Sequence, residues 1–200
     1  MSGMSFLKLK SQAGLAALVA MFAGSLALNV QQAWQLKGYQ MQDGPKQPVV
    51  GAKLKDLRVW RVGSKERSTL SFGDRPRVVY FLSPSCAWCK KNQANVAALA
   101  NSLSFGGKFE VIGLVAAVYR DQGLESMDAY LVEHPLPFAV YVSDDVDWFD
   151  NTGFNTTPLT VATVSGAVDQ AWIGGWTPVE MRSIEGFFRL KLPLPGMPAG

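Results

Sequence analysis

The chain has 200 residues and a net charge of +3, which allows one ordinary domain with short appendages. Hydrophobic residues make up 48% of the chain and charged residues 18%, and the charged share is below the roughly 25% of an average soluble domain. Part of the apolar sequence therefore lies outside a globular core. The sequence has no basic stripe with interleaved aromatic residues, which excludes nucleic-acid binding as a function class.

The first apolar run lies near the N-terminus. Residues 13–30 carry no charge, and Lys8 and Lys10 precede them. At about 1.5 Å per helical residue the run reaches about 27 Å, close to the thickness of a bilayer core. We therefore predict a cytoplasmic segment over 1–12 and a signal anchor over 13–30, which is a single transmembrane helix in contact with the lipid bilayer. A cleaved signal peptide with a weak cleavage site at 25–27 is the alternative.

The orientation of the predicted anchor follows from its charges. The positive flank stays on the cytoplasmic side and the rest of the chain is exported. We therefore predict that the protein is located in the bacterial inner membrane, with the main domain in the periplasm or on the outer face of the membrane. Residues 31–50 are polar and predict a linker, 51–191 predict the globular domain, and 192–200 predict a Pro- and Gly-rich tail.

The predicted domain alternates strands and helices. The continuous apolar run 78–82 predicts a central strand buried on both faces, and Thr177-Pro178 predicts the start of a final helix. The predicted elements are strands 57–62, 68–72 and 78–82, a helix from 89 to 106, a strand 109–118, a helix 123–133, a strand 138–142, a helical turn 146–150, strands 159–164 and 167–173, and the final helix. This order predicts an α/β fold with a mixed central sheet flanked by helices and an N-terminal β-hairpin.

The two cysteines of the chain are Cys86 and Cys89. They lie between the apolar strand and the first turn of a helix, where free backbone N–H groups and the helix dipole favour a thiolate. We predict that Cys86 attacks a substrate disulfide, or is attacked when oxidised, and that Cys89 resolves the mixed disulfide. An inert pair or half of a metal site is the alternative. A structural zinc site needs about four ligands, and the only histidine is His134, so we expect no metal.

The segment 79–92, VYFLSPSCAWCKKN, resembles the active-site segment of thioredoxin-like proteins. It is most similar to the membrane-anchored TlpA/ResA/DsbE-like thiol-disulfide oxidoreductases. The resemblance extends more loosely over 50–190, and residues 120–150 resemble the strand-helix insertion of that group. It implies a thioredoxin-like fold and an enzyme of the protein-disulfide reductase type. It also implies catalytic Cys86 and Cys89, whose redox-active disulfide takes the place of any cofactor.

The resemblance also implies roles for residues outside the cysteine pair. Thr157-Pro158 matches the cis-proline position of the family, so Pro158 would lie against the disulfide and the Thr157 backbone would bind an extended substrate segment. Trp88 is a candidate exposed lip that meets substrates, and simple packing over the helix end is its alternative. One departure concerns Tyr80, which takes the position where many thioredoxins carry a buried acid. The proton acceptor of Cys89 is therefore not identified.

The same resemblance implies partners. It predicts a reductase for periplasmic protein substrates with disulfides or thiols, for example in the maturation of cytochrome c or of a metalloprotein. A membrane thiol electron donor of the DsbD/CcdA type would keep the pair reduced. One alternative is a net oxidant or maturation factor that resembles the MauD group. Another is a Cu(I)-binding thioredoxin-like chaperone, because thiolates suit Cu(I), although Sco-like chaperones normally have a wider cysteine spacing and a later histidine.

Overall fold

The computed structural model describes residues 21–22, 24–25, 28–29, 31, 47–64, 66–117 and 120–192. The chain divides into two units, residues 1–44 and 45–200. In the first unit the described residues are helical, and the remainder of the predicted anchor 13–30, together with the segment 1–12, lies outside the described residues. Within the part that the structure describes, no helix has the length and apolar character needed to cross a bilayer. The tail from 193 onward also lies outside the described residues.

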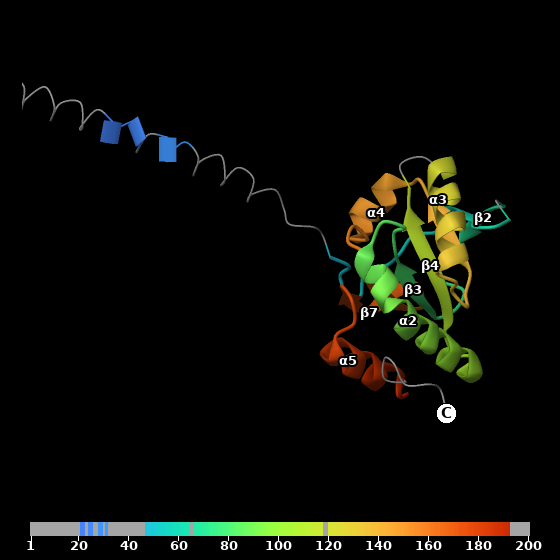
Figure 1. The fold of residues 1–200 in the computed structure, drawn as a ribbon. Helices are drawn as coiled ribbons and strands as arrows, with labels where there is room; N and C mark the ends of the chain where they lie inside the picture. Colours follow the sequence, from blue (N-terminus) through green and yellow to red (C-terminus); the bar gives the residue numbers. More distant parts are fainter. Residues whose placement is uncertain are drawn as a thin grey trace, which may run out of the picture. The chain divides into compact units, whose positions relative to one another are not determined.

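The second unit contains a seven-stranded mixed sheet (Figure 1). The strand order is β2-β1-β5-β4-β3-β6-β7. Strands β3, β4 and β5 run parallel to one another, and β1, β2, β6 and β7 are each antiparallel to their neighbours. The strands are β1 Leu57–Arg61, β2 Arg67–Leu70, β3 Arg77–Phe81, β4 Glu110–Ala116, β5 Val140–Ser143, β6 Leu159–Val164 and β7 Ala167–Ile173. The predicted mixed sheet and N-terminal hairpin are confirmed.

Helices cover both faces of this sheet. They are α2 Ala87–Gly106, α3 Arg120–Glu133, α4 Val146–Thr152 and α5 Pro178–Phe188. Buried residues of α2, α3 and α5 join one apolar cluster, and those of α4 join the other. The strand β3 separates the two clusters, because Val78 and Tyr80 point into the first while Val79 and Phe81 point into the second. This double burial explains why β3 is a continuous apolar run.

Local capping signals set the ends of the helices. Thr177 is the N-cap of α5, Pro178 is its first residue, and the Glu180 carboxylate accepts from the Thr177 backbone N–H at 3.1 Å in a capping box. The helix α2 ends at Gly107, whose φ of +62° is left-handed and costs glycine little. The turn predicted over 146–150 is the start of helix α4, with the Asp145 side chain as N-cap.

The segment that precedes β1 packs on the folded unit. Pro48 is buried. Residues 51–54 then run along the first half of β7, where the Gly51 N–H donates to the Val168 carbonyl at 2.7 Å and the Val168 N–H donates to the Ala52 carbonyl at 2.9 Å. The described segment 47–54 is therefore packed against the rest of the folded unit.

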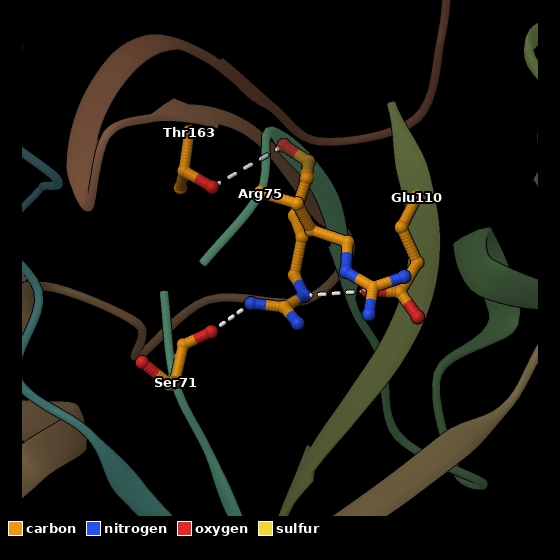
Figure 2. Close-up of polar contacts among 5 residues, drawn as sticks. Ser71, Arg75, Glu110 and Thr163 are labelled. Atoms are coloured by element: carbon orange, nitrogen blue, oxygen red, sulfur yellow. Dashed lines mark hydrogen bonds and ion pairs between the residues drawn. The ribbon is translucent and has the colours of Figure 1, made fainter. Parts of the chain in front are cut away.

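A buried arginine fixes the start of β3. Arg77 is 5% exposed, and its guanidinium donates to the Glu110 carboxylate at 2.7 Å and to the Ser71 carbonyl (Figure 2). The Thr163 hydroxyl donates to the Arg77 carbonyl at 3.4 Å, and Arg75 lies 3.7 Å from the same carboxylate. These contacts join β3 to β4 and β6 at the end of the sheet opposite the cysteines, because Cys86 follows the other end of β3.

Candidate active site

The cysteine pair lies where β3 passes into α2. The strand ends at Phe81, and the Leu82 N–H still donates to the Leu114 carbonyl at 3.0 Å, so β3 and β4 stay joined up to the loop. The Cys86 N–H donates to the Ser83 carbonyl at 3.1 Å and closes a tight turn. Cys86 is the N-cap of α2, and its Sγ accepts from the Cys89 N–H at 3.0 Å. The first turn of the helix therefore directs N–H groups at the Cys86 sulfur.

Cys86 and Cys89 form a disulfide with their Cα atoms 5.2 Å apart. Cys86 is partly exposed, whereas Cys89 is 0% exposed. A thiolate from solvent or from another protein can therefore reach only the Cys86 sulfur. Among the described residues, no group of three or more Cys, His, Asp or Glu side chains is arranged to hold a metal ion.

The Thr157–Pro158 peptide bond is cis, as the resemblance implied. Leu159, the next residue, pairs with Phe81 at the end of β3. The Gly174 N–H donates to the Pro158 carbonyl at 2.8 Å, which ties this loop to the end of β7. Pro158 is buried and Thr157 is half-buried. The structure thus brings the predicted Thr157 and Pro158 close to the C-terminal end of β3, where the cysteine loop begins.

A largely apolar pocket of about 310 Å³ also lies at the C-terminal end of β3. Ser83 of the cysteine loop and Thr157 both line it, together with Phe81, Phe149 and Phe154. Asp150 also lines it and is exposed on α4. The pocket therefore offers an apolar recess with one carboxylate beside the partly exposed cysteine loop.

No protein-family model matches the chain, and no curated protein does. Solved structures do match. A putative thiol:disulfide interchange protein DsbE from Chlorobium tepidum is 14% identical, with a TM-score of 0.56 over 71% of this chain and 97% of that one. A putative protein disulfide isomerase from Bacteroides thetaiotaomicron is 16% identical, with a TM-score of 0.58 over 71% and 89%.

A third match is the thioredoxin domain of a thiol-disulfide oxidoreductase from Bacteroides vulgatus, 16% identical, with a TM-score of 0.57 over 70% of this chain and 97% of that one. The chain has a thioredoxin-like fold. The resemblance of the segment 79–92 to such proteins is thereby confirmed as a likeness of fold.

Trp88, between the two cysteines, is 60% exposed. It lies against Gly175 in the loop after β7, where an added Cβ would come within 2.8 Å of the indole ring. The Lys91 ammonium lies 4.9 Å from the ring centroid. Trp88 therefore packs on the Gly175 loop and still presents most of its surface to solvent, and its contact with substrates stays a prediction.

Two neutral polar side chains of the thioredoxin-like domain are buried on β3 and on the inner face of α2. Tyr80 is 1% exposed and Asn92 is 3% exposed. Burial raises the pKa of the Tyr80 phenol above its ordinary value, and the nearby Asn92 amide opposes this rise. The Asn92 Oδ1 accepts from the Trp176 N–H at 3.3 Å and from Asn95 Nδ2 at 3.1 Å.

Sequence reasoning singled out Tyr80 but missed Asn92. The signal was available, because Asn92 follows Cys89 by three residues and so lies on the same face of α2. An asparagine in a helix is usually a solvated residue, which conceals that signal. His134 is not at the cysteine pair: it contacts Gln93 and the ring of Tyr130.

Proposed function

We propose that the protein is a thiol-disulfide oxidoreductase that exchanges disulfides with other proteins and acts as a reductase. The observation that carries this proposal is the disulfide at the N-terminus of α2, in which Cys86 is accessible and Cys89 is buried. Such a pair has one sulfur that can attack and one that can only resolve. The thioredoxin-like fold supports the proposal.

The chemistry starts from the dithiol. The Cys86 thiolate, stabilised by the N–H groups at the start of α2, attacks one sulfur of a substrate disulfide and the other substrate sulfur leaves as a thiolate. The Cys89 thiolate then attacks the Cys86 sulfur of the mixed disulfide. The second substrate sulfur leaves, so the substrate gains two electrons and Cys86–Cys89 becomes a disulfide. An external dithiol donor must return two electrons to complete the cycle.

The substrate would bind as an extended segment along Thr157–Pro158. The cis peptide lies near the C-terminal end of β3, where the cysteine loop begins, and half-buried Thr157 is accessible there. Backbone pairing at this position suits many sequences, because it reads the main chain and not the side chains. The apolar pocket lined by Ser83 and Thr157 would take a substrate side chain.

Replacing Trp88 with Ala is expected to slow exchange with a protein substrate about three- to tenfold while leaving the rate with dithiothreitol unchanged. The indole is 60% exposed and would contact a protein but hardly a small dithiol. The measurement compares the rates of insulin reduction and of dithiothreitol oxidation by stopped flow. Phe105→Ala, which removes an aromatic that is 95% exposed on α2, is the control. Equal slowing with both substrates would show that Trp88 affects the cysteines and not the substrate.

We also propose a membrane location. The uncharged run 13–30 behind Lys8 and Lys10 supports a single-pass anchor in the bacterial inner membrane, with the thioredoxin-like domain in the periplasm or on the outer face. A membrane dithiol donor of the DsbD/CcdA type is then the natural source of electrons, and cytochrome c or metalloprotein maturation the natural use. Retention of the full chain in carbonate-washed membranes tests the anchor, and release into the wash would contradict it.

The reduction potential of the full chain tests the proposed function. Titration with glutathione buffers is expected to give a reversible two-electron transition at a potential well below about −180 mV, since net oxidants lie near about −120 mV. A transition near the higher value would favour the oxidant that resembles the MauD group. The single-cysteine variant Cys89→Ser is the control, because it has no intramolecular disulfide to titrate. A chain with no reversible two-thiol transition would contradict the proposal.

A further inference from the structure

Two buried polar groups, one on β3 and one on the helix turn after Cys89, lack a well-formed hydrogen bond. Within the part of the chain that the structure describes, the Tyr80 hydroxyl and the Asn92 Nδ2 have no hydrogen-bond partner of good geometry. Both side chains are at least nine-tenths buried. Buried polar groups are almost always hydrogen-bonded, because leaving one unpaired costs its full desolvation free energy. Two such groups in the buried cluster and helix that hold Cys89 therefore call for an explanation.

These two groups and Cys89 lie on the same side of the sheet. Tyr80 of β3 belongs to the same buried cluster as Cys89 of α2. Asn92 lies one turn after Cys89 on the buried face of α2, and its amide acts on the Tyr80 phenol. The Trp176 backbone N–H can only donate, so the atom that faces it is the Asn92 oxygen. The NH₂ end of Asn92 is thereby the end that interacts with the Tyr80 phenol, and it makes no well-formed hydrogen bond there.

Opening the disulfide produces the acceptor that these donors lack. When an incoming thiolate attacks the accessible Cys86 sulfur, the new S–S bond joins Cys86 to the attacking sulfur and the Cys86–Cys89 bond breaks. The electron pair of the broken bond goes to the Cys89 sulfur, which becomes a thiolate in a position that is 0% exposed. A buried anion is costly unless hydrogen bonds stabilise it.

We propose that the Tyr80 hydroxyl and the Asn92 NH₂ are a pair of hydrogen-bond donors for the Cys89 thiolate, without a well-formed hydrogen bond in the disulfide form and paired once the disulfide opens. This inference rests on the proposed oxidoreductase function and deepens it. The donors hold the leaving sulfur when Cys86 is attacked and keep it anionic for the return attack. The proton that finally converts Cys89 to a thiol comes from water, so the step balances without an acid in the site.

The surroundings favour hydrogen bonding over proton transfer. Burial raises the pKa of the Tyr80 phenol, so it keeps its proton near neutral pH and donates it only as a hydrogen bond. The other ionisable group that acts on Tyr80 among the described residues is Tyr130 of α3. Lys90 and Lys91, which follow Cys89 on α2, are exposed. No carboxylate is among the groups that act on Tyr80, so the site stabilises the anion with neutral donors.

The test uses the full chain with Cys86→Ser, in which Cys89 is the only thiol. Thiolate absorbance at 240 nm is followed against pH in this parent, in Tyr80→Phe and in Asn92→Leu. Loss of either donor is expected to lower the thiolate equilibrium constant about tenfold, which raises the pKa of Cys89 by about one unit. The reduction potential is measured with both cysteines present. At pH values above the pKa of Cys89, Tyr80→Phe is expected to make this potential more negative by ~30 mV, since a tenfold change in the equilibrium constant of a two-electron reduction is ~30 mV.

The control is Tyr141→Phe, the same change on β5 against the opposite apolar cluster, which is expected to shift neither quantity. If Tyr80→Phe and Asn92→Leu both leave the pKa of Cys89 at the parent value, the two groups are only structural and the inference is overturned. A chain that has no reversible disulfide at all contradicts the proposed function instead. A protein that keeps a reversible disulfide but shows no change in the pKa of Cys89 in the variants therefore contradicts only this inference and not the proposed function. Urea unfolding of each variant verifies that it is folded.

Discussion

Replacing Cys86 with Ser is expected to lower disulfide exchange by at least about 10³-fold, whereas replacing Cys89 with Ser is expected to leave a protein that attacks once and stays joined to its substrate. The difference follows from exposure, because Cys86 is accessible and caps α2 while Cys89 is 0% exposed. Without Cys86 there is no sulfur that a substrate can reach. Without Cys89 no second sulfur releases the mixed disulfide.

The measurement is the reduction of insulin by dithiothreitol in the presence of each variant, with mixed disulfides detected on non-reducing gels. The double variant with both cysteines replaced is the baseline, because it retains the fold-forming residues and contains no thiol. Mixed disulfides formed by Cys86→Ser but not by Cys89→Ser would reverse the assignment. They would show that the buried sulfur becomes accessible before exchange.

Replacing Phe154 with Ala is expected to lower the free energy of unfolding by about 3–5 kcal/mol, a large share of the roughly 5–15 kcal/mol that holds a domain folded. Phe154 is 0% exposed and packs against Phe81 and Trp148, with ring centroids 5.8 and 5.2 Å away. Because the ring is fully buried, its removal loses the free energy of transfer and leaves an unfilled space beside the pocket that Phe154 lines.

Urea denaturation of the oxidised protein measures this effect. Phe105→Ala is the matched control, because that ring is 95% exposed and its loss is expected to change stability by no more than about 0.5 kcal/mol. Similar midpoints for the two variants would mean that the site collapses around the smaller residue. Phe154 packs on Phe81, the last residue of the strand that leads into the cysteine loop. The same variant is therefore also expected to make local unfolding of that loop easier.

Much of the fold could be predicted because its signals are local. The apolar run 78–82 predicts the doubly buried strand β3, Gly107 ends α2, and Thr177 with Pro178 begins α5. Each signal depends on residues within one turn or one strand, where propensity and capping act. The cysteine pair could be predicted in the same way, since the two cysteines lie at the junction of an apolar strand and a helix.

Contacts between distant segments could not be predicted in this way. Asn92 holds the Trp176 backbone, and Trp88 lies on Gly175, each across more than half of the domain sequence. Arg77 reads as a surface charge, yet it is buried against Glu110 of the next strand. Such placements depend on the order in which strands pair, and that order is fixed by the whole chain and not by any one segment.

The segment 51–54 has a consequence for how the domain meets other chains. An edge strand presents unpaired backbone groups to which a second polypeptide can add, which is a route to aggregation. The edge strand β2 has four residues, three of them exposed and polar or charged, which makes a poor template. At the other edge, residues 51–54 pair with Ala167 and Val168 at the start of β7. Among the described residues, the open edge of β7 therefore lies over residues 169–173, the end nearer the cysteine loop.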